Sequence, residues 1–521
     1  MGTFPNLAGL ILAVTMLPLL AWAGEGGSFV LINMTPYNWN QIYIHSDQMN
    51  AWGFPQSVPA GSMAKVYVEW DQSIFDDQED DGGQVIYQLQ GAPISASFQL
   101  QASATTTSFN LQAYYTNIAT TSHPLGSVVD LGWVHDGNTV FVLSGVPGLL
   151  MNTINPPTNW MQLSLPTVGN KPLRQLVIPG SHDSGMSLID GSTFFGDDAD
   201  HVLTQTLSVG GQLANGARYF DLRPVISSGI FKTGHYSTLP VVGYQGANGE
   251  SFSQIISEIN AFTSVNAELI ILNLSHDLNT DSGYGSLTQA NWNQLFQQLS
   301  GLSHLYVAPN PTTIDLSTLP LSQFIGQGSA AVIVLVDAGD TTVTLGSYAS
   351  RGFYNSTTQF PLFDSYANTN DLSTLENDQL TKLAQNRTSW NSSEFLLSWT
   401  LTQQPIDFTP KDAPSIIDYA NQANNDLFTA LPPVINRNVF PNILYIDNFN
   451  RTDVTALAIG INDYNTNWQA MDIQVQLFVS LGRRVTQKLR DAARFFQLPY
   501  KSFQDRRRKR TVEESFRVVS I

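Results

Sequence analysis

Short runs of β-forming residues, separated by turn-forming residues, occupy the segment between residues 24 and 147. β-branched and aromatic side chains favour strands, and closely spaced runs of this kind are typical of a β-sandwich. We therefore expect an all-β, sandwich-like module. Its predicted strands are Ser28–Leu31, Gln41–Ile44, Ala64–Trp70, Gln84–Leu89, Ser95–Leu100, Ser108–Tyr114 and Thr139–Leu143.

The pattern changes after Pro147 and the pair Pro156-Pro157. Behind a predicted linker at 148–168, apolar runs alternate with helical segments from 169 to 465, which predicts an α/β fold with a TIM-type (β/α) barrel. The strand candidates are Leu176–Ile178, Arg218–Leu222, Leu269–Leu274, Ala331–Val336, Leu362–Tyr366, Glu394–Leu401 and Asn442–Asp447.

Two helices of this region have clear signatures. Apolar residues recur at helical spacing from Phe252 to Phe262, behind a capping box formed by Ser251 and Gln254. The second helix has its apolar face between Val454 and Ile461.

A further extended piece, Gly229–His235, follows the strand candidate Arg218–Leu222 after only six residues. A parallel crossover needs a dozen residues or more. We therefore expect a hairpin here and a barrel that is distorted or incomplete.

Charge is unevenly distributed in this chain, whose net charge is −18. From Leu481 onward lie 12 of the 24 Lys and Arg residues but only 4 of the 42 Asp and Glu residues, so the preceding part carries 12 basic and 38 acidic residues. Such an acidic body argues against nucleic acid as a partner. We interpret 466–521 as a basic, disordered tail; an anionic-lipid patch or a processing site is the alternative.

The acidic run from Asp76 to Asp81 half-matches a calcium-binding loop, but Gln88 stands at the twelfth place instead of a bidentate glutamate. We interpret the run as a solvated acidic loop.

The first 23 residues predict a secretory signal peptide. Leu10–Leu20 is an apolar core, and Ala21-Trp22-Ala23 is a small-x-small cleavage pattern. An uncleaved membrane anchor is the alternative. Glycosylation sequons support a secreted, extracellular protein, and the absence of cysteine means that it has no disulfides. The sequons lie at Asn33, Asn355, Asn386, Asn391 and Asn450, with one at Asn273 expected to be silent inside a strand.

Polar residues follow the predicted strands at their C-terminal ends. In a barrel these ends converge on one face, where enzymes of this fold carry their active sites. The residues are His182 and Asp183, Asp221 and Arg223, His235 on the hairpin, Ser275 and His276, Asp337, Asp364 and Tyr366, and Asp447.

Two histidines with carboxylates and one arginine amount to a general base, a general acid and an anion clamp. This set suits phosphodiester cleavage. The base takes a proton from an attacking hydroxyl, Arg223 neutralises the phosphoryl oxygens, and the acid protonates the departing oxygen.

Four segments resemble the X-domain of phosphatidylinositol-specific phospholipase C, in its secreted, metal-independent bacterial-type branch, and the related phospholipase C-like phosphodiesterases. They are Ile178-Pro-Gly-Ser-His-Asp-Ser-Gly185, Gly216-Ala-Arg-Tyr-Phe-Asp-Leu-Arg223, Gly234-His235 and Leu269-Ile-Ile-Leu-Asn-Leu274. Looser similarities are Phe363-Asp-Ser-Tyr366 and Tyr445-Ile-Asp447.

The resemblance implies that His182 is the general base, oriented by Asp447, and that His235 is the general acid, supported by Asp183. It implies that Arg223 binds the phosphate, with Asp221 nearby to position the basic groups. The products would be diacylglycerol and a cyclic inositol phosphate.

The resemblance also bears on metals and on the substrate. Arg223 stands where the calcium-dependent branch binds its metal, so we expect no catalytic metal and no cofactor. Asp364, Tyr366, Ser275 and Asp337 are the expected substrate-binding residues. Ser275 and Asp337 differ from the basic residues that contact inositol in the bacterial enzymes, so the headgroup stays open. The expected partners are a phospholipid or glycosylphosphatidylinositol substrate and a transient membrane surface.

Two other function classes stay open. A metal-dependent glycerophosphodiesterase or phospholipase D on a similar barrel would need a carboxylate cluster. A non-catalytic lipid- or glycan-binding protein would use the β-module, with the barrel as a scaffold.

Overall fold

The structure, a computed structural model, describes residues 24–466 except 73–78, 93, 106, 195, 240–241, 338, 340–341 and 405–412. The described residues lie within one compact unit. The predicted signal peptide, the tail from 467 onward, and Asp76 and Asp77 of the acidic run lie outside the described residues. Within these limits, the search for a helix that is both long and apolar enough to cross a membrane finds none.

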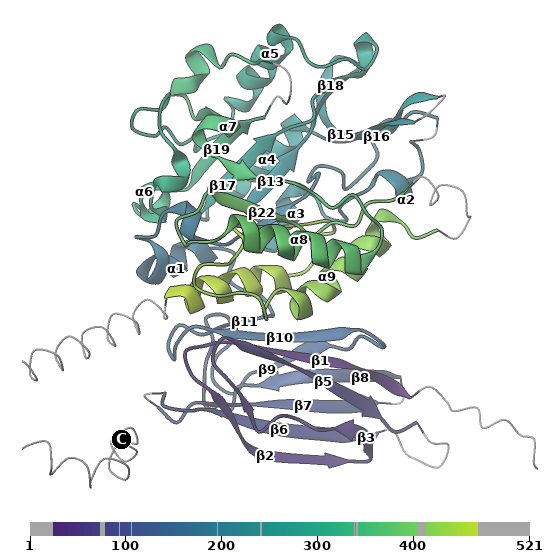
Figure 1. Ribbon diagram of the computed structural model, residues 1–521, viewed down its shortest axis with the longest axis vertical. Coiled ribbons are helices and arrows are strands. Elements are labelled where there is room, and N and C mark those ends of the chain that lie inside the picture. The colour runs from purple at the N-terminus through teal and green to yellow at the C-terminus, as the bar shows by residue number, and fades with distance from the viewer. Residues whose placement is uncertain are drawn as a thin grey trace, which may run out of the picture. The chain divides into compact units, whose positions relative to one another are not determined.

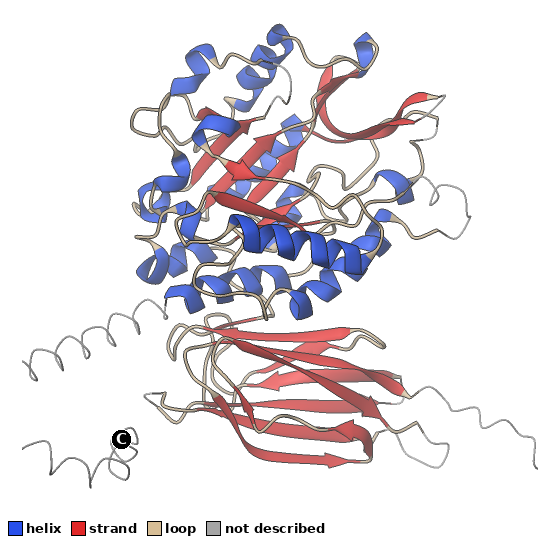
Figure 2. Ribbon diagram, in the orientation of Figure 1, coloured by secondary structure: helices blue, strands red, loops and turns tan. Residues whose placement is uncertain are grey.

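The N-terminal region consists of two β-sheets, as the sequence predicts (Figure 2). One sheet has the order β11-β10-β1-β5-β3 and the other β4-β2-β6-β7-β8-β9. The strands are β1 Glu25–Met34, β2 Trp39–Asp47, β3 Met49–Trp52, β4 Ser57–Val58, β5 Ser62–Trp70, β6 Gly82–Leu89, β7 Ser97–Thr105, β8 Ser108–Tyr114, β9 Val128–Gly132, β10 Asn138–Ser144 and β11 Met151–Asn152. Each predicted strand of this region overlaps one of them.

Strand β1 shares its side chains between two cores, because alternate residues of a strand point to opposite faces of the sheet. Phe29 and Leu31 pack in the sandwich core, whereas Val30, Ile32 and Met34 belong to the core shared with the barrel. The sheet of β1 and β10 is therefore buried on both faces, which explains why Phe29–Ile32 and Val140–Leu143 are continuously apolar.

The second region is built on an eight-stranded sheet whose order is β20-β19-β17-β13-β12-β23-β22-β21 (Figure 1). Every pairing in it is parallel. The strands are β12 Ile178–Ser181, β13 Tyr219–Leu222, β17 Leu269–Leu274, β19 Ala331–Val336, β20 Phe353–Asn355, β21 Leu362–Phe363, β22 Glu394–Ser398 and β23 Ile443–Ile446. Because β20 and β21 stand at opposite ends of this order, the predicted barrel is confirmed in its incomplete form.

The predicted hairpin is also confirmed. Strand β14, Pro224–Ser227, pairs antiparallel with β15, Ile230–Leu239, and β15 pairs with β16, Gly243–Ser251. The short strand β18, Leu278–Asn279, adds to β14. The eighth barrel strand is therefore β20, which is only three residues long, too short for a recognisable period-2 pattern.

Helices connect most of the barrel strands. Helix α4 begins where expected, and Ser251 Oγ accepts the amide of Gln254 at 3.3 Å, but the side chain of Gln254 reaches forward to Glu258 and does not complete a capping box. The helices are α1 Trp160–Val168, α2 Ala199–Val202, α3 Val209–Ala214, α4 Phe252–Thr263, α5 Gln289–Leu299, α6 Leu321–Ile325, α7 Ser356–Gln359, α8 Leu372–Asn386, α9 Ile416–Ala430 and a last helix over 453–466. Helix α1 falls in the segment expected as a linker, and the domain boundaries stay a prediction.

The barrel strands are buried on both faces, as parallel strands usually are. In β17, Ile270 and Leu272 pack with the helix-side core, and Leu269 and Ile271 pack with the core of the opposite face. Charged side chains have little room between these two layers, so they collect where the strands end.

One glycosylation expectation is wrong. Asn33 is fully buried, and its Nδ2 donates to the carbonyl oxygens of Tyr37 and Val58 at 2.8 and 2.9 Å. A glycan cannot be attached to a side chain enclosed in this way. Asn391 and Asn450 are exposed, and Asn273 lies within β17 as expected.

Candidate active site

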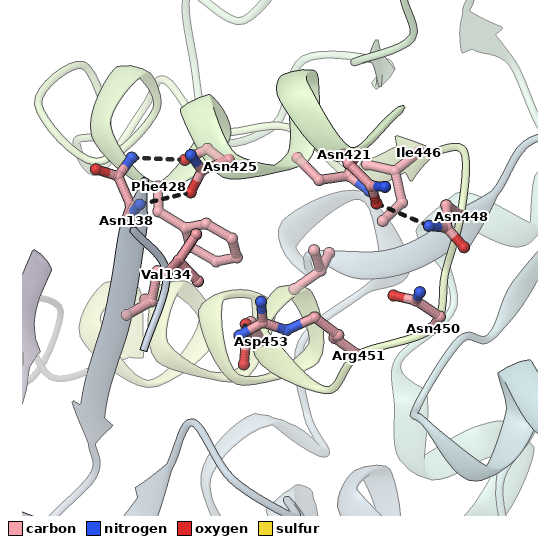
Figure 3. Close-up of a pocket in the computed structure, with 13 residues that line it drawn as sticks. Val134, Asn138, Asn421, Asn425, Phe428, Ile446, Asn448, Asn450, Arg451 and Asp453 are labelled. Atoms are coloured by element: carbon pink, nitrogen blue, oxygen red, sulfur yellow. Dashed lines mark hydrogen bonds and ion pairs between the residues drawn. The ribbon is translucent and has the colours of Figure 1, made fainter. Parts of the chain in front are cut away.

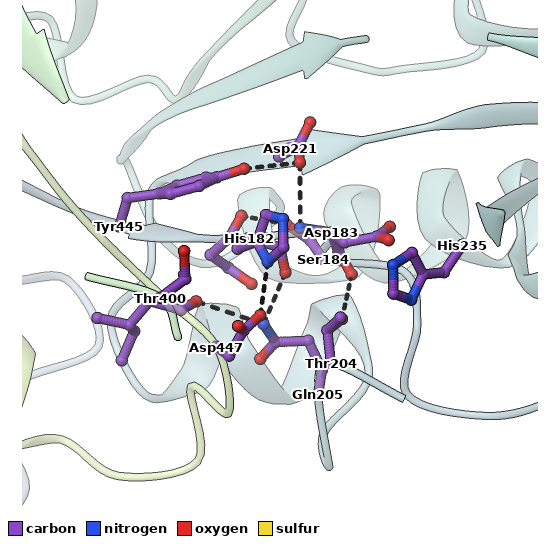
Figure 4. Close-up of polar contacts among 12 residues, drawn as sticks. His182, Asp183, Ser184, Thr204, Gln205, Asp221, His235, Thr400, Tyr445 and Asp447 are labelled. Carbon is purple, nitrogen blue, oxygen red and sulfur yellow. Dashed lines mark hydrogen bonds and ion pairs between the residues drawn. The ribbon is translucent and has the colours of Figure 1, made fainter. Parts of the chain in front are cut away.

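His182 lies directly after β12, between a carboxylate and a guanidinium. Its Nδ1 donates to Asp447 Oδ1 at 2.7 Å (Figure 4), and its Nε2 accepts from Arg223 Nη2 at 2.6 Å. Asp447 follows β23, the neighbour of β12 in the sheet. These two contacts fix the neutral tautomer with a lone pair on Nε2, the atom that a general base needs.

Three charges decide the proton affinity of His182. Burial lowers its pKa, but the negative charge of Asp447, its hydrogen bond and the charge of Asp221 more than compensate, although Arg223 opposes them. The pKa of His182 is raised above its ordinary value as a result.

Asp221, near the end of β13, is the centre of the polar network. It accepts hydrogen bonds from Tyr445 Oη at 2.7 Å, Ser275 Oγ at 2.6 Å and the amide of Asp183 at 3.1 Å. Burial by itself raises the pKa of Asp221, yet the positive charge of Arg223 first, and the hydrogen bond from Ser275 after it, hold it well below the ordinary range. Asp221 is therefore a permanent anion beneath the site.

Arg223 is held by two carboxylates. Its Nη1 lies 3.2 Å from Asp183 Oδ2 and its Nε 3.3 Å from Asp221 Oδ2. Burial raises the pKa of Asp183 to about 7, with Arg223 opposing the rise. The guanidinium thus has a fixed orientation and points one edge at His182, which is the geometry that a phosphate clamp requires.

Three side chains fix the backbone after β12: two from the segment before α3 and one from α3 itself. The carbonyl oxygens of His182, Asp183 and Ser184 accept hydrogen bonds from Gln205 Nε2 at 2.8 Å, Thr204 Oγ1 at 2.9 Å and Gln212 Nε2 at 2.9 Å. Asp183 has a φ of 38°, and these bonds hold it there. Since the three donors are almost fully buried, the site rests on a rigid frame.

Gly185 brings the hairpin close to this frame. A Cβ at this position would lie 2.3 Å from Thr233 Oγ1 on β15, so only glycine fits. Thr233 Oγ1 donates to the Gly185 carbonyl at 3.0 Å. His235 follows two residues later on the same strand.

His235 differs from the sequence expectation in its partner. Its Nδ1 donates to the carbonyl oxygen of Val202 at 3.3 Å, which leaves the Nε2 lone pair free. Among the described residues no ion pair or hydrogen bond joins it to Asp183, and no dashed line joins the two in Figure 4. Asp183 pairs with Arg223 instead. Burial, and then the positive charges of Arg223 and His182, lower the pKa of His235 to about 3.

Ser275 and His276 extend the polar network around Asp221. Ser275 was expected to bind substrate, but it is 5% exposed and donates to Asp221. His276 Nδ1 donates to Ser275 Oγ at 2.9 Å and extends the network by one residue. Tyr445, for which the sequence predicted no role, packs its ring edge-on at 5.2 Å from the ring of His182; its sequence signals are the Tyr445-Ile-Asp447 similarity and its place in the last barrel strand.

Two of the expected substrate-binding residues, Asp337 and Asp364, line a cavity of about 630 Å³ between β13, β17 and β21. Asp364 is open to solvent at the cavity yet enclosed by protein on its other sides; this enclosure and the charge of Asp221 raise its pKa to about 6. Tyr366 is 58% exposed and does not line the cavity. Across the described part of the chain, no group of three or more His, Cys, Asp or Glu side chains is arranged to hold a metal ion.

The chain shares sequence with a protein of known domain type. Over 130 residues it is 31% identical to a PI-PLC X-box domain-containing protein of Dictyostelium discoideum. The matched region is 22% of this chain and 16% of the length of that X-box protein. No family model matches the chain.

Solved structures of bacterial phospholipases are similar as well. A phosphatidylinositol-specific phospholipase C of Staphylococcus aureus is 16% identical with a TM-score of 0.43, over 59% of this chain and 97% of that structure. The enzyme of Listeria monocytogenes is 19% identical with a TM-score of 0.39, over 56% of this chain and 95% of that structure.

Proposed function

We propose that this protein is a phospholipase C-like phosphodiesterase acting on a phosphatidylinositol-type lipid, and that it releases diacylglycerol and a cyclic phosphate. The observation that carries this proposal is the position of His182, with Nδ1 on Asp447 and Nε2 against Arg223. The similarity to the X-box protein supports the substrate class.

The first half of the reaction uses the His182 side. When a phosphodiester binds, its oxygens replace Nε2 of His182 as partners of Arg223, and Nε2 becomes free to accept a proton. It takes this proton from a hydroxyl of the headgroup, whose oxygen forms a bond to phosphorus. Arg223 stabilises the charge that develops on the phosphoryl oxygens.

The second half uses His235. The bond between phosphorus and the diacylglycerol oxygen breaks, and this oxygen takes a proton from Nε2 of His235. The pKa of His235 is about 3 before substrate binds. The negative phosphodiester raises this pKa because an opposite charge nearby favours the protonated imidazole. Binding of the phosphodiester therefore favours the protonated form of His235, which the second step needs.

A lipid surface is the proposed partner, and a secreted location is proposed from the sequence alone. Tyr244 lies near the start of β16, beside the strand that carries His235, and Val242 lies directly before β16; the two are 40% and 44% exposed. Thr193 bonds to Gly246 of the same strand, and next to it Phe194 is 84% exposed. Exposed apolar side chains at the rim of a site suit insertion into a lipid interface.

The test is phosphorus NMR of the full chain with phosphatidylinositol vesicles in EDTA, beside the His182→Ala variant. A cyclic phosphodiester signal from the parent alone supports the proposal. Turnover that appears only after calcium or magnesium is restored would show a metal-dependent enzyme instead. No turnover in either condition, also with glycosylphosphatidylinositol, would contradict the proposal and favour a binding protein.

A further inference from the structure

A second cavity, of about 280 Å³, lies where β10 faces α9 and the start of the last helix, and the two chain neighbours of Asp447, Ile446 and Asn448, are among its lining residues (Figure 3). Its walls combine five apolar side chains with asparagines from three separate segments. The asparagines are Asn138, Asn421, Asn424, Asn425, Asn448 and Asn450, and the apolar residues are Val134, Val140, Phe428, Ile446 and Val454.

Some of the asparagines serve the structure. The side-chain Nδ2 of Asn138 donates to the carbonyl oxygen of Asn425 at 2.9 Å, and the backbone N–H of Asn138 donates to Asn425 Oδ1 at 3.1 Å. Asn448 donates to Asn421 Oδ1 at 2.8 Å and accepts from Thr206. These bonds fix the carboxamides around the cavity (Figure 3).

Other amide groups keep hydrogen-bonding capacity. Asn424 donates its Nδ2 to the carbonyl oxygen of Asp447 at 2.8 Å, but its buried Oδ1 has no partner. Within the described ranges, Nδ2 of Asn421 and of Asn425 donate to no other residue. The Asn424 Oδ1 is closed off by protein, but Asn421 is exposed and Asn425 is only partly buried, so their amides are within reach of a ligand. These amides can donate to the hydroxyl oxygens of a ligand.

The cavity has little net charge. Its one cation and one anion, Arg451 and Asp453, face each other with Nη2 and Oδ2 at 2.6 Å. A phosphate or a cation would find no unpaired counter-charge here, whereas a neutral ligand needs none. The ring of Phe428 and the valines offer an apolar wall for carbon atoms, as ligand sites usually do.

From these features we propose that the cavity binds a neutral carbohydrate of about monosaccharide size. Sites for small ligands start at roughly 300 Å³, so the volume of about 280 Å³ excludes a larger oligosaccharide from its interior. Asn450 lines the cavity, is exposed and belongs to the sequon Asn450-Arg451-Thr452. The sugar could thus be free in solution or attached to the chain itself.

Titration calorimetry of the full chain produced in bacteria, which add no such glycan, tests the proposal. The probes are glucose, mannose and N-acetylglucosamine, with glucose 6-phosphate as the charged comparison. At least one neutral sugar is expected to bind saturably, and at least tenfold tighter than the phosphate ester.

Two variants locate the binding. Val454→Phe fills the cavity and should abolish binding, and Asn421→Ala removes a carboxamide from an exposed residue and should weaken binding at least fivefold. Asn377→Ala, on the exposed face of α8, is the matched control and should bind like the parent. Thermal unfolding shows whether each variant is folded. If Val454→Phe does not fold, the binding measured with Asn421→Ala decides the test.

The same titration with protein from a eukaryotic secretory host separates the two sources. If the attached glycan occupies the cavity, free sugar binds only after Asn450→Gln; if it does not, the two preparations bind alike. Failure of every neutral sugar to bind the bacterial protein, or binding that both Val454→Phe and Asn421→Ala leave unchanged, would overturn the proposal. The proposal does not depend on phosphodiesterase activity.

Discussion

His182 and His235 have contrasting surroundings although they serve one site. His182 lies at the carboxyl end of a central strand of the parallel sheet, between Asp447 and Arg223. His235 lies on a hairpin, with a backbone carbonyl as its partner. The pKa of His182 is raised and that of His235 is lowered to about 3. The group with the higher pKa is the better proton acceptor, and the group with the lower pKa is, once protonated, the better donor. Burial and neighbouring charge, not residue type, thus distinguish the proposed base from the proposed acid.

The largest effect should come from removing the histidines in turn. We expect His182→Ala and His235→Ala each to lower kcat with the lipid by about 10³- to 10⁴-fold. With a phosphodiester analogue whose leaving group is nitrophenolate, His235→Ala should lose less than about tenfold, because such a group departs without a proton. His182→Ala should lose as much as before.

Rates of both variants on both substrates measure this difference. Equal losses for His235→Ala on the two substrates would refute its role as the acid. Circular dichroism of the two variants controls for folding.

Arg223→Lys should lower kcat by about 10²- to 10³-fold, the usual effect of removing one stabilising donor from a transition state. Lysine keeps the charge but cannot contact Asp183, Asp221 and the phosphate at once, because it lacks the planar fork. Steady-state kinetics with phosphatidylinositol measure the loss. Lys382→Arg, at a partly exposed ion pair on α8, is the control. A loss below tenfold would mean that a positive charge at this position stabilises the transition state without the planar fork of arginine.

Asp447→Asn should lower kcat by about 10²-fold and move the pH profile. A base is active when deprotonated, so the rate falls as the pH drops through the pKa of His182, which is raised above its ordinary value chiefly by Asp447 in opposition to burial. Without this carboxylate the pKa falls, and the acid limb should shift to lower pH. The pH dependence of kcat/KM measures the shift, with the exposed Asp136→Asn as control. An acid limb that does not move would show that this limb does not report the titration of His182.

The smallest predicted effect is on stability, on the hairpin side. Glu250, in β16, is buried, and burial raises its pKa to about 7 from 4.5 in the unfolded chain. The folded state therefore holds a proton that the unfolded state releases, so its contribution is full below about pH 4.5 and is lost as the pH rises to about 7. Glu250→Gln keeps the neutral form and should be about 2–3 kcal/mol more stable than the parent at pH 8, relative to their difference at pH 4.5.

Urea unfolding of the parent and Glu250→Gln at both pH values measures this change. Glu376→Gln on α8 is the control. The same stability difference at both pH values would show that Glu250 is already charged in the folded protein.

The barrel could be predicted because its strands are long apolar runs that end in polar residues. Leu269–Leu274 and Ala331–Val336 have the predicted bounds. The three residues of β20 could not be predicted, because such a short strand is stabilised by its neighbours and not by its own pattern. Asn33 matched a sequon by sequence alone, yet burial closes it.

The site was predictable as a set of residues but not as a set of pairs. Strand ends placed His182, Asp221, Arg223 and Asp447 at one edge, and the structure brings them into contact. The expected pairing of Asp183 with His235 is not formed, because Arg223 is a stronger partner for a buried carboxylate than a neutral imidazole.

The sequence by itself therefore determined the fold class and the edge where the chemistry collects, because periodicity and strand ends are local properties of the chain. Only the tertiary structure decided the partners of each charge, the role of Ser275 beneath Asp221 and the asparagine-lined cavity. These depend on distances between segments far apart in the sequence, and electrostatic energies change steeply over a few ångströms in a buried site.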